Sequence, residues 1–140
     1  DGDLGGNLFK IQMPPDAHIT NLHAFWDAAG GAFGFSSPKR PLDAAGKDRI
    51  RSLAEEVMKE NPAEGIAELS DLDPHTWVVE SNTLAREVVH KNIVEGETPS
   101  RAYTDAAQKL SRKRIATAGY RLAGVLNALF IKPSAPAKTN

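Results

Sequence analysis

The sequence contains no cysteine among its 140 residues. This absence excludes disulfides, thiolate metal sites and cysteine nucleophiles, and leaves His, Asp and Glu as the side chains able to bind a metal ion. It does not exclude an exported protein, because many exported proteins have no disulfide. Long apolar runs are lacking too. None approaches the roughly 18 residues of a membrane span, so we expect no membrane partner.

An excess of basic residues is also missing. The chain has 17 Lys plus Arg against 18 Asp plus Glu, which gives a net charge of -1. Proteins that grip long stretches of duplex are usually basic, so this balance disfavours DNA packaging or duplex reading. A compact site that handles one or two phosphates through metal ions remains compatible with it. The length is that of one ordinary domain, long enough to bury a core.

The first third of the chain combines irregular backbone with one strand and one helix. Apolar and polar residues alternate over residues 9–13, which predicts a short half-buried strand. A helix is predicted over residues 21–29, ended by Gly30-Gly31. Trp26 is expected to anchor this helix in the core.

Three longer helices are predicted further along. Residues 43–60 are amphipathic, a second helix starts at Asp73-Pro74 and ends before Gly96, and residues 100–131 form a third. Each of the last two is expected to turn one stripe inward. The first stripe consists of Trp77, Ser81, Leu84 and Val88. The second consists of Ile115, Ala118, Leu122, Leu126 and Leu129, and is extended backwards by Tyr103, Ala107 and Leu110. The fold class is therefore all-α, and we expect residues 132–140 to be a disordered tail.

The chemistry concentrates in Asn21–Asp27. In a helix, His23 and Asp27 lie one turn apart and about 40° apart around the axis, on the same face. Both can reach one zinc ion at roughly 2.0–2.2 Å. Two ligands do not hold a zinc, so further ligands must come from elsewhere. Taken alone, the pair is better explained by a His–Asp hydrogen bond on a surface helix.

The wider pattern resembles the zinc-dependent single-strand-specific nucleases, the nuclease S-one/P-one family. The resemblance rests on Gly5-Gly6-Asn7, Asn21-Leu22-His23-x-x-Trp26-Asp27, Trp77-x-x-Glu80-Ser81, and the run from Ala118 to Asn127. These four motifs occur in the family's order and span residues 3 to about 130. The resemblance implies the helical fold shared with phospholipase C, with a short β segment near the N-terminus.

The resemblance also implies an activity: endonucleolytic hydrolysis of single-stranded DNA and RNA to 5′-phosphorylated products, with 3′-nucleotidase activity on nucleotides. The family binds three zinc ions, and only His23 and Asp27 carry over as ligands, both to one zinc. The family's other ligands, including an N-terminal tryptophan amine and a second His-x-x-x-Asp run, are absent. We therefore expect residues 1–140 to be the C-terminal half of one zinc nuclease domain, partnered by an N-terminal half, in a secreted or periplasmic enzyme.

Gly5 and Asn7 correspond by resemblance to the glycine backbone and asparagine side chain that bind a base beside the zinc cluster. An amide has both a donor and an acceptor, so it can contact a base edge without demanding one base. A preference for single strands follows if that base must leave the stack, which costs a few kcal/mol in a duplex. The alternative is that these residues form only a tight turn.

The remaining polar residues receive structural interpretations. His18, His75 and His90 are not expected to be ligands, and Glu80 is expected to pair with an arginine such as Arg121. The basic run of Lys109, Arg112, Lys113 and Arg114 is interpreted as a solvated helix face, with nucleic-acid steering as a minor alternative.

Two alternatives exist for the whole protein. One is a phospholipase C of the same superfold, although those enzymes generally have Glu where this chain has Asp27. The other is a helical interaction module that binds no metal.

Overall fold

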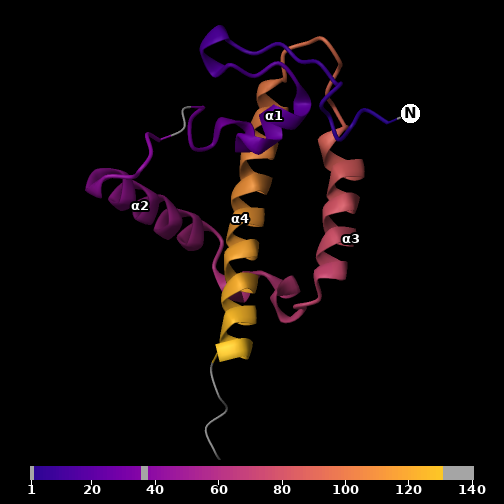
Figure 1. The fold of residues 1–140 in the computed structure, drawn as a ribbon. Coiled ribbons are helices and arrows are strands. Elements are labelled where there is room, and N and C mark those ends of the chain that lie inside the picture. The colour runs from indigo at the N-terminus through magenta and orange to yellow at the C-terminus, as the bar shows by residue number, and fades with distance from the viewer. Residues whose placement is uncertain (1, 36–37, 131–140) are drawn as a thin grey trace, which may run out of the picture.

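The computed structural model describes residues 2–35 and 38–130, so the prediction for residues 132–140 lies outside the described part (Figure 1). The all-α prediction is confirmed. The α-helices are α1 (Leu22–Asp27), α2 (Ala44–Glu60), α3 (Pro74–Leu84) and α4 (Arg101–Phe130), with short 3-10 turns between them. None of the described helices is long and apolar enough to cross a membrane.

The long helix α4 is the axis of the molecule. Figure 1 shows α2 on one side of α4 and α3 on the other, with α1 lying across its N-terminal end. The 3-10 turn Ala29–Gly31, which follows α1, packs against α4. The short helix that carries His23 and Asp27 is thus held against the long helix α4 through this turn.

The first three helices begin where the sequence predicts, because each has a polar N-cap. Asn21 Oδ1 accepts the N–H of Ala24 at 2.8 Å, and Asp43 and Asp73 cap α2 and α3 in the same way. Such caps satisfy backbone N–H groups that have no partner within the helix. Beyond Leu84, α3 continues as a π-helical turn, Ala85–Val89, which the sequence did not predict.

The predicted strand over residues 9–13 is not formed. In the described part of the chain, the β structure is a single antiparallel bridge between Lys10 and Asn21. The alternation itself is correct, since Ile11 is buried and its neighbours on the same side pack on the core. Pro14 and Pro15 follow directly, and proline has no N–H to extend a ladder.

Two clusters make up the buried core. The larger one surrounds Leu22 and Phe25, both with no exposed surface, and joins α1 to the N-terminal end of α4 through Tyr103 and Ala107. The smaller one consists of Val57, Ile66 and Ala116, between α2 and the middle of α4.

The predicted inward face of α4 is confirmed at Tyr103 and Ala107, which are buried, and is wrong over the second half of the helix. There the apolar stripe is exposed, with Ile115 at 48% and Leu122, Leu126 and Leu129 also exposed. The buried positions of this half are instead Ala116, Thr117 and Arg121. A polar contact from Arg121 to α3 turns this side inward, and apolar periodicity cannot reveal such a contact. The stripe predicted for α3 is also only partly buried, and no residue of α3 is fully enclosed.

Candidate metal centre

The loop before residue 10 folds onto the N-terminus of α1. The N–H of Leu22 donates to Phe9 O at 2.9 Å, and the N–H of His23 donates to Gly6 O at 3.2 Å. Gly6 has φ +86°, and a Cβ there would lie 3.1 Å from the backbone nitrogen of His23. Glycine at this position therefore permits the close approach that brings the loop beside the His23 side chain.

The imidazole of His23 is oriented by this loop. Its Nδ1 lies 3.0 Å from the carbonyl oxygen of Gly5, which can only accept a hydrogen bond, so Nδ1 carries a proton. In the neutral ring, Nε2 then has a free lone pair, and it lies 3.3 Å from Asp27 Oδ2. At this distance the two atoms can share a hydrogen bond, as in the alternative interpretation, or can both contact one metal ion.

The pair fits zinc. Two ligands at roughly 2.0–2.1 Å from a tetrahedral ion stand about 3.3 Å apart, which matches the separation of Nε2 and Oδ2. A backbone carbonyl on the other ring nitrogen is the usual support of a metal-binding histidine. Residues 2–35 and 38–130 contain no group of three or more His, Asp or Glu side chains placed to hold a metal ion. The described part of the chain thus places two candidate ligands side by side.

The two residues predicted to bind a base lie in the same loop. Gly5 is adjacent to His23 through the carbonyl contact, and its φ is +67°. The Asn7 side chain is exposed and donates one N–H to Leu4 O at 2.9 Å, which is the turn contact of the alternative interpretation. The other amide hydrogen and Oδ1 are not used in that bond. A role in base binding remains a prediction for both residues.

Comparisons with known proteins decide the family. The model of the S1/P1 nuclease family matches residues 1–131. The chain belongs to the S1/P1 nuclease family. It is 30% identical to Endonuclease 1 of Arabidopsis thaliana over 91% of this chain and 42% of that protein. It is 28% identical to Nuclease S1 of Aspergillus oryzae over 94% of this chain and 48% of that protein.

The chain spans less than half the length of the curated relatives that it matches. A third relative, Endonuclease 3 of Arabidopsis thaliana, is 29% identical over 92% of this chain and 44% of its own length. No solved structure gave a significant match. The predicted family is confirmed, and the match favours it over the phospholipase C alternative.

Behind the candidate metal centre, a hydrogen-bond chain that the sequence did not predict fixes α1. Trp26 Nε1 donates to the Tyr103 hydroxyl at 2.9 Å, and that hydroxyl donates to Val89 O in the π-helical turn. Burial raises the pKa of Tyr103 above its usual value. Phe25 is the fully buried anchor of α1, whereas Trp26 is only partly buried. Sequence separation hid these partners, since Trp26 and Tyr103 are 77 positions apart.

Another contact ties the loop to the end of the π-helical turn. His90 Nε2 lies 3.5 Å from Asp3 Oδ2, and the edge of the Phe9 ring packs against the His90 ring. His90 therefore links this loop to the end of the π-helical turn. His18 ends a 3-10 turn with φ 54°, and His75 lies exposed in the first turn of α3.

The predicted pair of Glu80 with Arg121 is confirmed. The Arg121 guanidinium binds both carboxylate oxygens of Glu80, at 2.7 and 2.8 Å, and packs over the Trp77 ring. Arg114 adds a bond at 3.1 Å. The hydrogen bond from Arg121 is the main cause that lowers the pKa of Glu80 to about 2. Arg121 is only 3% exposed, so this pair joins α3 to α4 and does not face a substrate.

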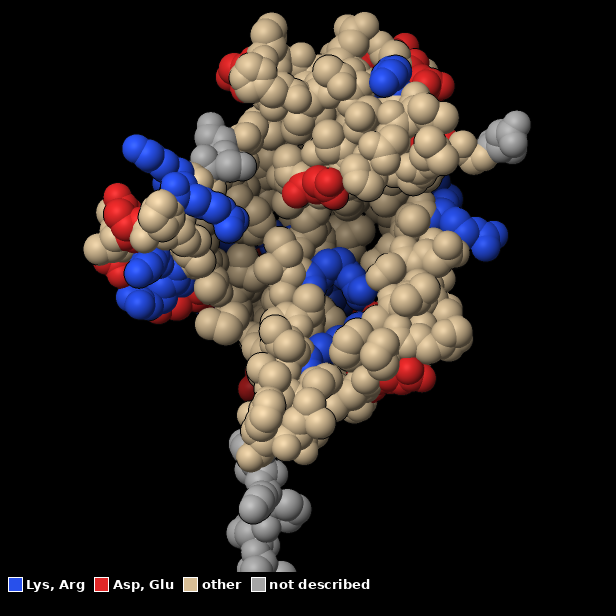
Figure 2. Space-filling model, viewed as in Figure 1, with Lys and Arg blue, Asp and Glu red and all other residues tan. Residues whose placement is uncertain are grey.

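The interpretation of the basic run as a solvated face holds for Lys109, which is exposed, and is wrong for Arg112 and Arg114. Arg112 donates to Glu60 at 2.6 Å and to Glu56 at 2.7 Å, which links α4 to α2. Lys113 approaches Glu68, and Arg114 belongs to the Glu80 network. Figure 2 shows basic side chains in the hollow between α3 and α4. These three residues contact three different elements, namely α2, the 3-10 turn Ala67–Ser70 and α3, because successive residues of a helix point in different directions.

Proposed function

We propose that this chain forms one part of a zinc-dependent endonuclease that hydrolyses phosphodiester bonds of single-stranded DNA and RNA to 5′-phosphorylated products. We further propose 3′-nucleotidase activity and a secreted or periplasmic location. One observation carries the proposal: His23 Nε2 and Asp27 Oδ2 face each other at 3.3 Å, with Nδ1 held by Gly5. The match of residues 1–131 to the S1/P1 family supports the reaction class.

In this proposal His23 and Asp27 bind one zinc ion, and the Gly5 carbonyl keeps the imidazole in the tautomer that can do so. The remaining ligands, and two further zinc ions, belong to the rest of the polypeptide, since the chain spans less than half of its relatives. Bound zinc lowers the pKa of a coordinated water and stabilises charge that develops on the phosphate.

Gly5 and Asn7 are proposed to contact a base next to the zinc site. The exposed Asn7 amide has one N–H and its oxygen available beyond the bond to Leu4, which suits a base edge. The loop lies directly against the His23 ring, so a base bound there would have its phosphate near the metal ligands. Reaching the loop requires an unstacked base, which favours single strands over duplex.

Zinc content and cleavage test the ligand assignment. The polypeptide that joins this chain to the rest of the nuclease is purified, its zinc is measured by elemental analysis, and a single-stranded oligonucleotide is used as substrate. His23→Ala and Asp27→Asn should each lower zinc by about one ion and abolish cleavage. His75→Ala and Asp48→Asn, both exposed and neither lining the cavity beside Asp27, serve as controls and should change neither. Retention of full zinc content by His23→Ala would refute the assignment.

A second variant separates base binding from metal binding. Asn7→Ala should raise KM for the oligonucleotide several-fold while zinc content and melting temperature stay unchanged. Gln12→Ala removes another exposed amide from the same segment and should leave KM unchanged. An unchanged KM for Asn7→Ala would show that Asn7 serves only the turn.

A further inference from the structure

Two consecutive residues at the end of the π-helical turn reach the two parts of the candidate metal centre. The carbonyl oxygen of Val89 accepts a hydrogen bond from the Tyr103 hydroxyl, which in turn accepts one from Trp26 of α1. The next residue, His90, has its Nε2 atom 3.5 Å from Asp3 Oδ2, in the loop before α1. Figure 1 shows this N-terminal segment passing beside the upper end of α3. Single π-helical turns are frequent at functional sites, so the contacts made here are candidates for more than a structural role.

The loop that His90 contacts is strained. Leu4, Gly5 and Gly6 have φ values of 55°, 67° and 86°, so three successive residues adopt positive φ. Leucine rarely adopts this conformation, because its Cβ crowds the backbone. Such a conformation persists only where the surrounding structure holds it, and it is common at sites that clamp a ligand. The loop that carries Asn7 therefore depends on contacts from outside the loop.

His90 supplies such contacts at both ends of the loop. Its ring packs edge to face with Phe9, at a centroid distance of 5.8 Å, and its Nε2 faces the carboxylate of Asp3. Asp3 O accepts the N–H of Leu8 at 3.0 Å, which closes the loop between these two points. The side chains of His90 and Asp3 are 38% and 34% exposed, so their contact is partly shielded from solvent. Asn7 lies between the two residues that His90 contacts.

The metal-binding helix holds a different part of the same loop. The carbonyl oxygens of Gly5 and Gly6 lie 3.0 Å from His23 Nδ1 and 3.2 Å from its backbone nitrogen. Hydrogen bonds with the segment that follows His90 begin at Lys10, which lies after the loop. In the described part of the chain, His90 thus makes the polar contact that reaches residues 3–9 from the end of the π-helical turn.

We propose that His90 is a positioning residue for base binding, which holds the loop in the conformation that presents Asn7 to a base. This inference rests on the proposed function, because it uses the proposed base contact of Asn7. His90 does not touch the substrate in this role and acts through Asp3 and Phe9. The loop contacts with His23 are separate, so the metal ligands keep their positions without the His90 side chain.

Steady-state kinetics on a single-stranded thymidine oligonucleotide test this role, in the polypeptide that joins this chain to the rest of the nuclease. His90→Ala should raise KM about threefold, which is the size of effect that a partly exposed pair supports. Zinc content and kcat should stay unchanged, because a rise in KM alone reports weaker binding of substrate and transition state alike. His90→Gln keeps an N–H donor for Asp3 and should return KM to about the wild-type value. His75→Ala, the same change in the first turn of α3, is the matched control and should leave KM unchanged.

A double variant tests whether His90 acts through Asp3. Asp3→Ala should raise KM by a factor similar to that of His90→Ala, and the two changes together should raise it little further than either alone. Additive increases would mean that the two residues act independently, as they would if the His90 ring contacted the nucleic acid directly. That result would overturn the proposal.

Amide hydrogen exchange in the same polypeptide, measured by nuclear magnetic resonance, reports on the loop without requiring activity. The N–H of Leu8, which is bonded to Asp3 O, should exchange at least about threefold faster in His90→Ala. The N–H of His23, which is bonded to Gly6 O, should keep its rate. Unchanged exchange at Leu8, or faster exchange with an unchanged KM, would overturn the proposal.

The remaining outcomes separate this inference from the proposed function. A wild-type polypeptide without zinc or cleavage refutes the function, whereas faster exchange at Leu8 in His90→Ala would still support His90 as the residue that holds the loop. Zinc-dependent cleavage with an unchanged KM in His90→Ala keeps the function and overturns the role of His90. Loss of zinc in His90→Ala also overturns that role, since the metal ligands would then depend on this residue.

Discussion

The N-terminal end and the middle of α4 are packed in different ways. At its N-terminal end, Tyr103 and Ala107 are enclosed together with Leu22 and Phe25, neither of which has exposed surface. Further along, Ala116 is buried against α2, yet its neighbour Ile115 is nearly half exposed. One helix thus has a closed end and an open middle.

The closed end draws on several segments of the chain. Its core combines Ile11 and Ile19 with α1 and α4, and the three aromatic rings of Phe25, Trp26 and Tyr103 pack against one another. The open part depends on α2 and one 3-10 turn. Burial on all sides requires elements on all sides, and the described residues supply them only around α1.

The ion pairs that join α4 to α3 and to α2 also differ in how exposed they are. Between α3 and α4, Arg121 is buried beside Glu80, so this contact is protected from solvent. Between α2 and α4, Arg112 binds Glu56 and Glu60, whose side chains are about half exposed. Exposed pairs contribute little to stability, whereas breaking a buried pair is strongly destabilising. The region behind the candidate metal centre is therefore enclosed, whereas the α2 side of α4 is more exposed.

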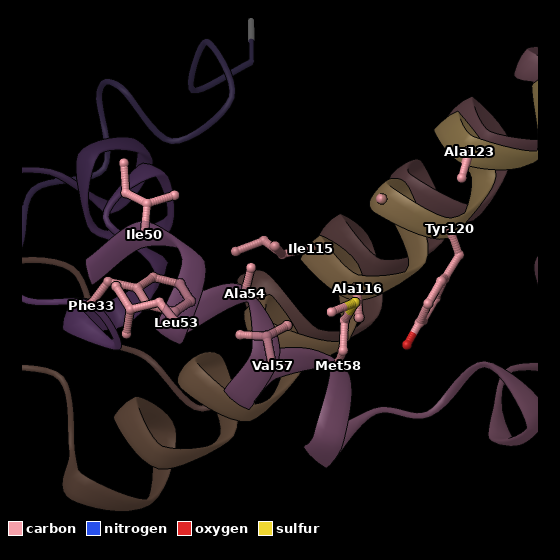
Figure 3. Close-up of a pocket in the computed structure, with 11 residues that line it drawn as sticks. Phe33, Ile50, Leu53, Ala54, Val57, Met58, Ile115, Ala116, Tyr120 and Ala123 are labelled. Carbon is pink, nitrogen blue, oxygen red and sulfur yellow. The ribbon is translucent and has the colours of Figure 1, made fainter. Parts of the chain in front are cut away.

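Truncating the closed core should have the largest effect. Phe25→Ala removes a ring with no exposed surface and should lower the free energy of unfolding by about 3–5 kcal/mol, measured by urea denaturation. Phe33→Ala is the matched change in the apolar groove between α2 and α4 (Figure 3), where the ring is only partly buried, and should cost less than about 2 kcal/mol. Equal losses would contradict the contrast between the two regions.

Removing the charge of Glu80 should come next. Glu80→Gln leaves Arg121 buried without its carboxylate and should cost about 2–4 kcal/mol at pH 7. Glu60→Gln, the matched change on α2, should cost much less.

This effect should depend on pH. The pKa of Glu80 is lowered to about 2 in the fold from 4.5, so its stabilisation is fully present above pH 4.5 and is lost as the pH falls toward 2. The difference in unfolding free energy between wild type and Glu80→Gln should therefore narrow across that range in urea titrations. A difference that does not change with pH would contradict the ionised pair.

The helix starts and the shared face of His23 and Asp27 can be predicted from the sequence because they depend on local signals. Asp73 caps its helix as expected, the helices predicted from residues 21 and 43 begin there, and the spacing of His23 and Asp27 places both on one face. Caps and helical spacing involve residues within four positions of each other, so a linear pattern contains them.

The errors concern contacts between distant segments. The predicted inward face is wrong for the second half of α4, because Arg121 reaches Glu80, 41 positions away, and turns a polar side inward. The loop contact of Gly5 with His23 and the Trp26–Tyr103 bond were missed for the same reason. Apolar periodicity also does not distinguish a stripe that is buried in the fold from one that is exposed. The sequence therefore predicts an interior position for Ile115, which is exposed.

Tyr103 provides a smaller test of the closed end. Tyr103→Phe keeps the ring but removes the hydroxyl that accepts from Trp26 and donates to Val89. The loss should be about 1–2 kcal/mol, since two partly buried groups lose a partner. Amide hydrogen exchange in α1 should also become faster, because Trp26 loses its tie to α4. Unchanged exchange in α1 would show that ring packing alone holds this helix.

The smallest effect is expected elsewhere in the groove between α2 and α4. Ile50→Ala removes a side chain that is nearly half exposed, so little buried apolar area is lost in the chain alone. Alanine also has a higher helix propensity than isoleucine, which offsets part of that loss within α2. The net change in unfolding free energy should stay within about 0.5 kcal/mol by urea denaturation, far below the cost of Leu22→Ala at the closed end. A cost near that of Leu22→Ala would mean that Ile50 is enclosed in the isolated chain. It would contradict the contrast between the N-terminal end and the middle of α4.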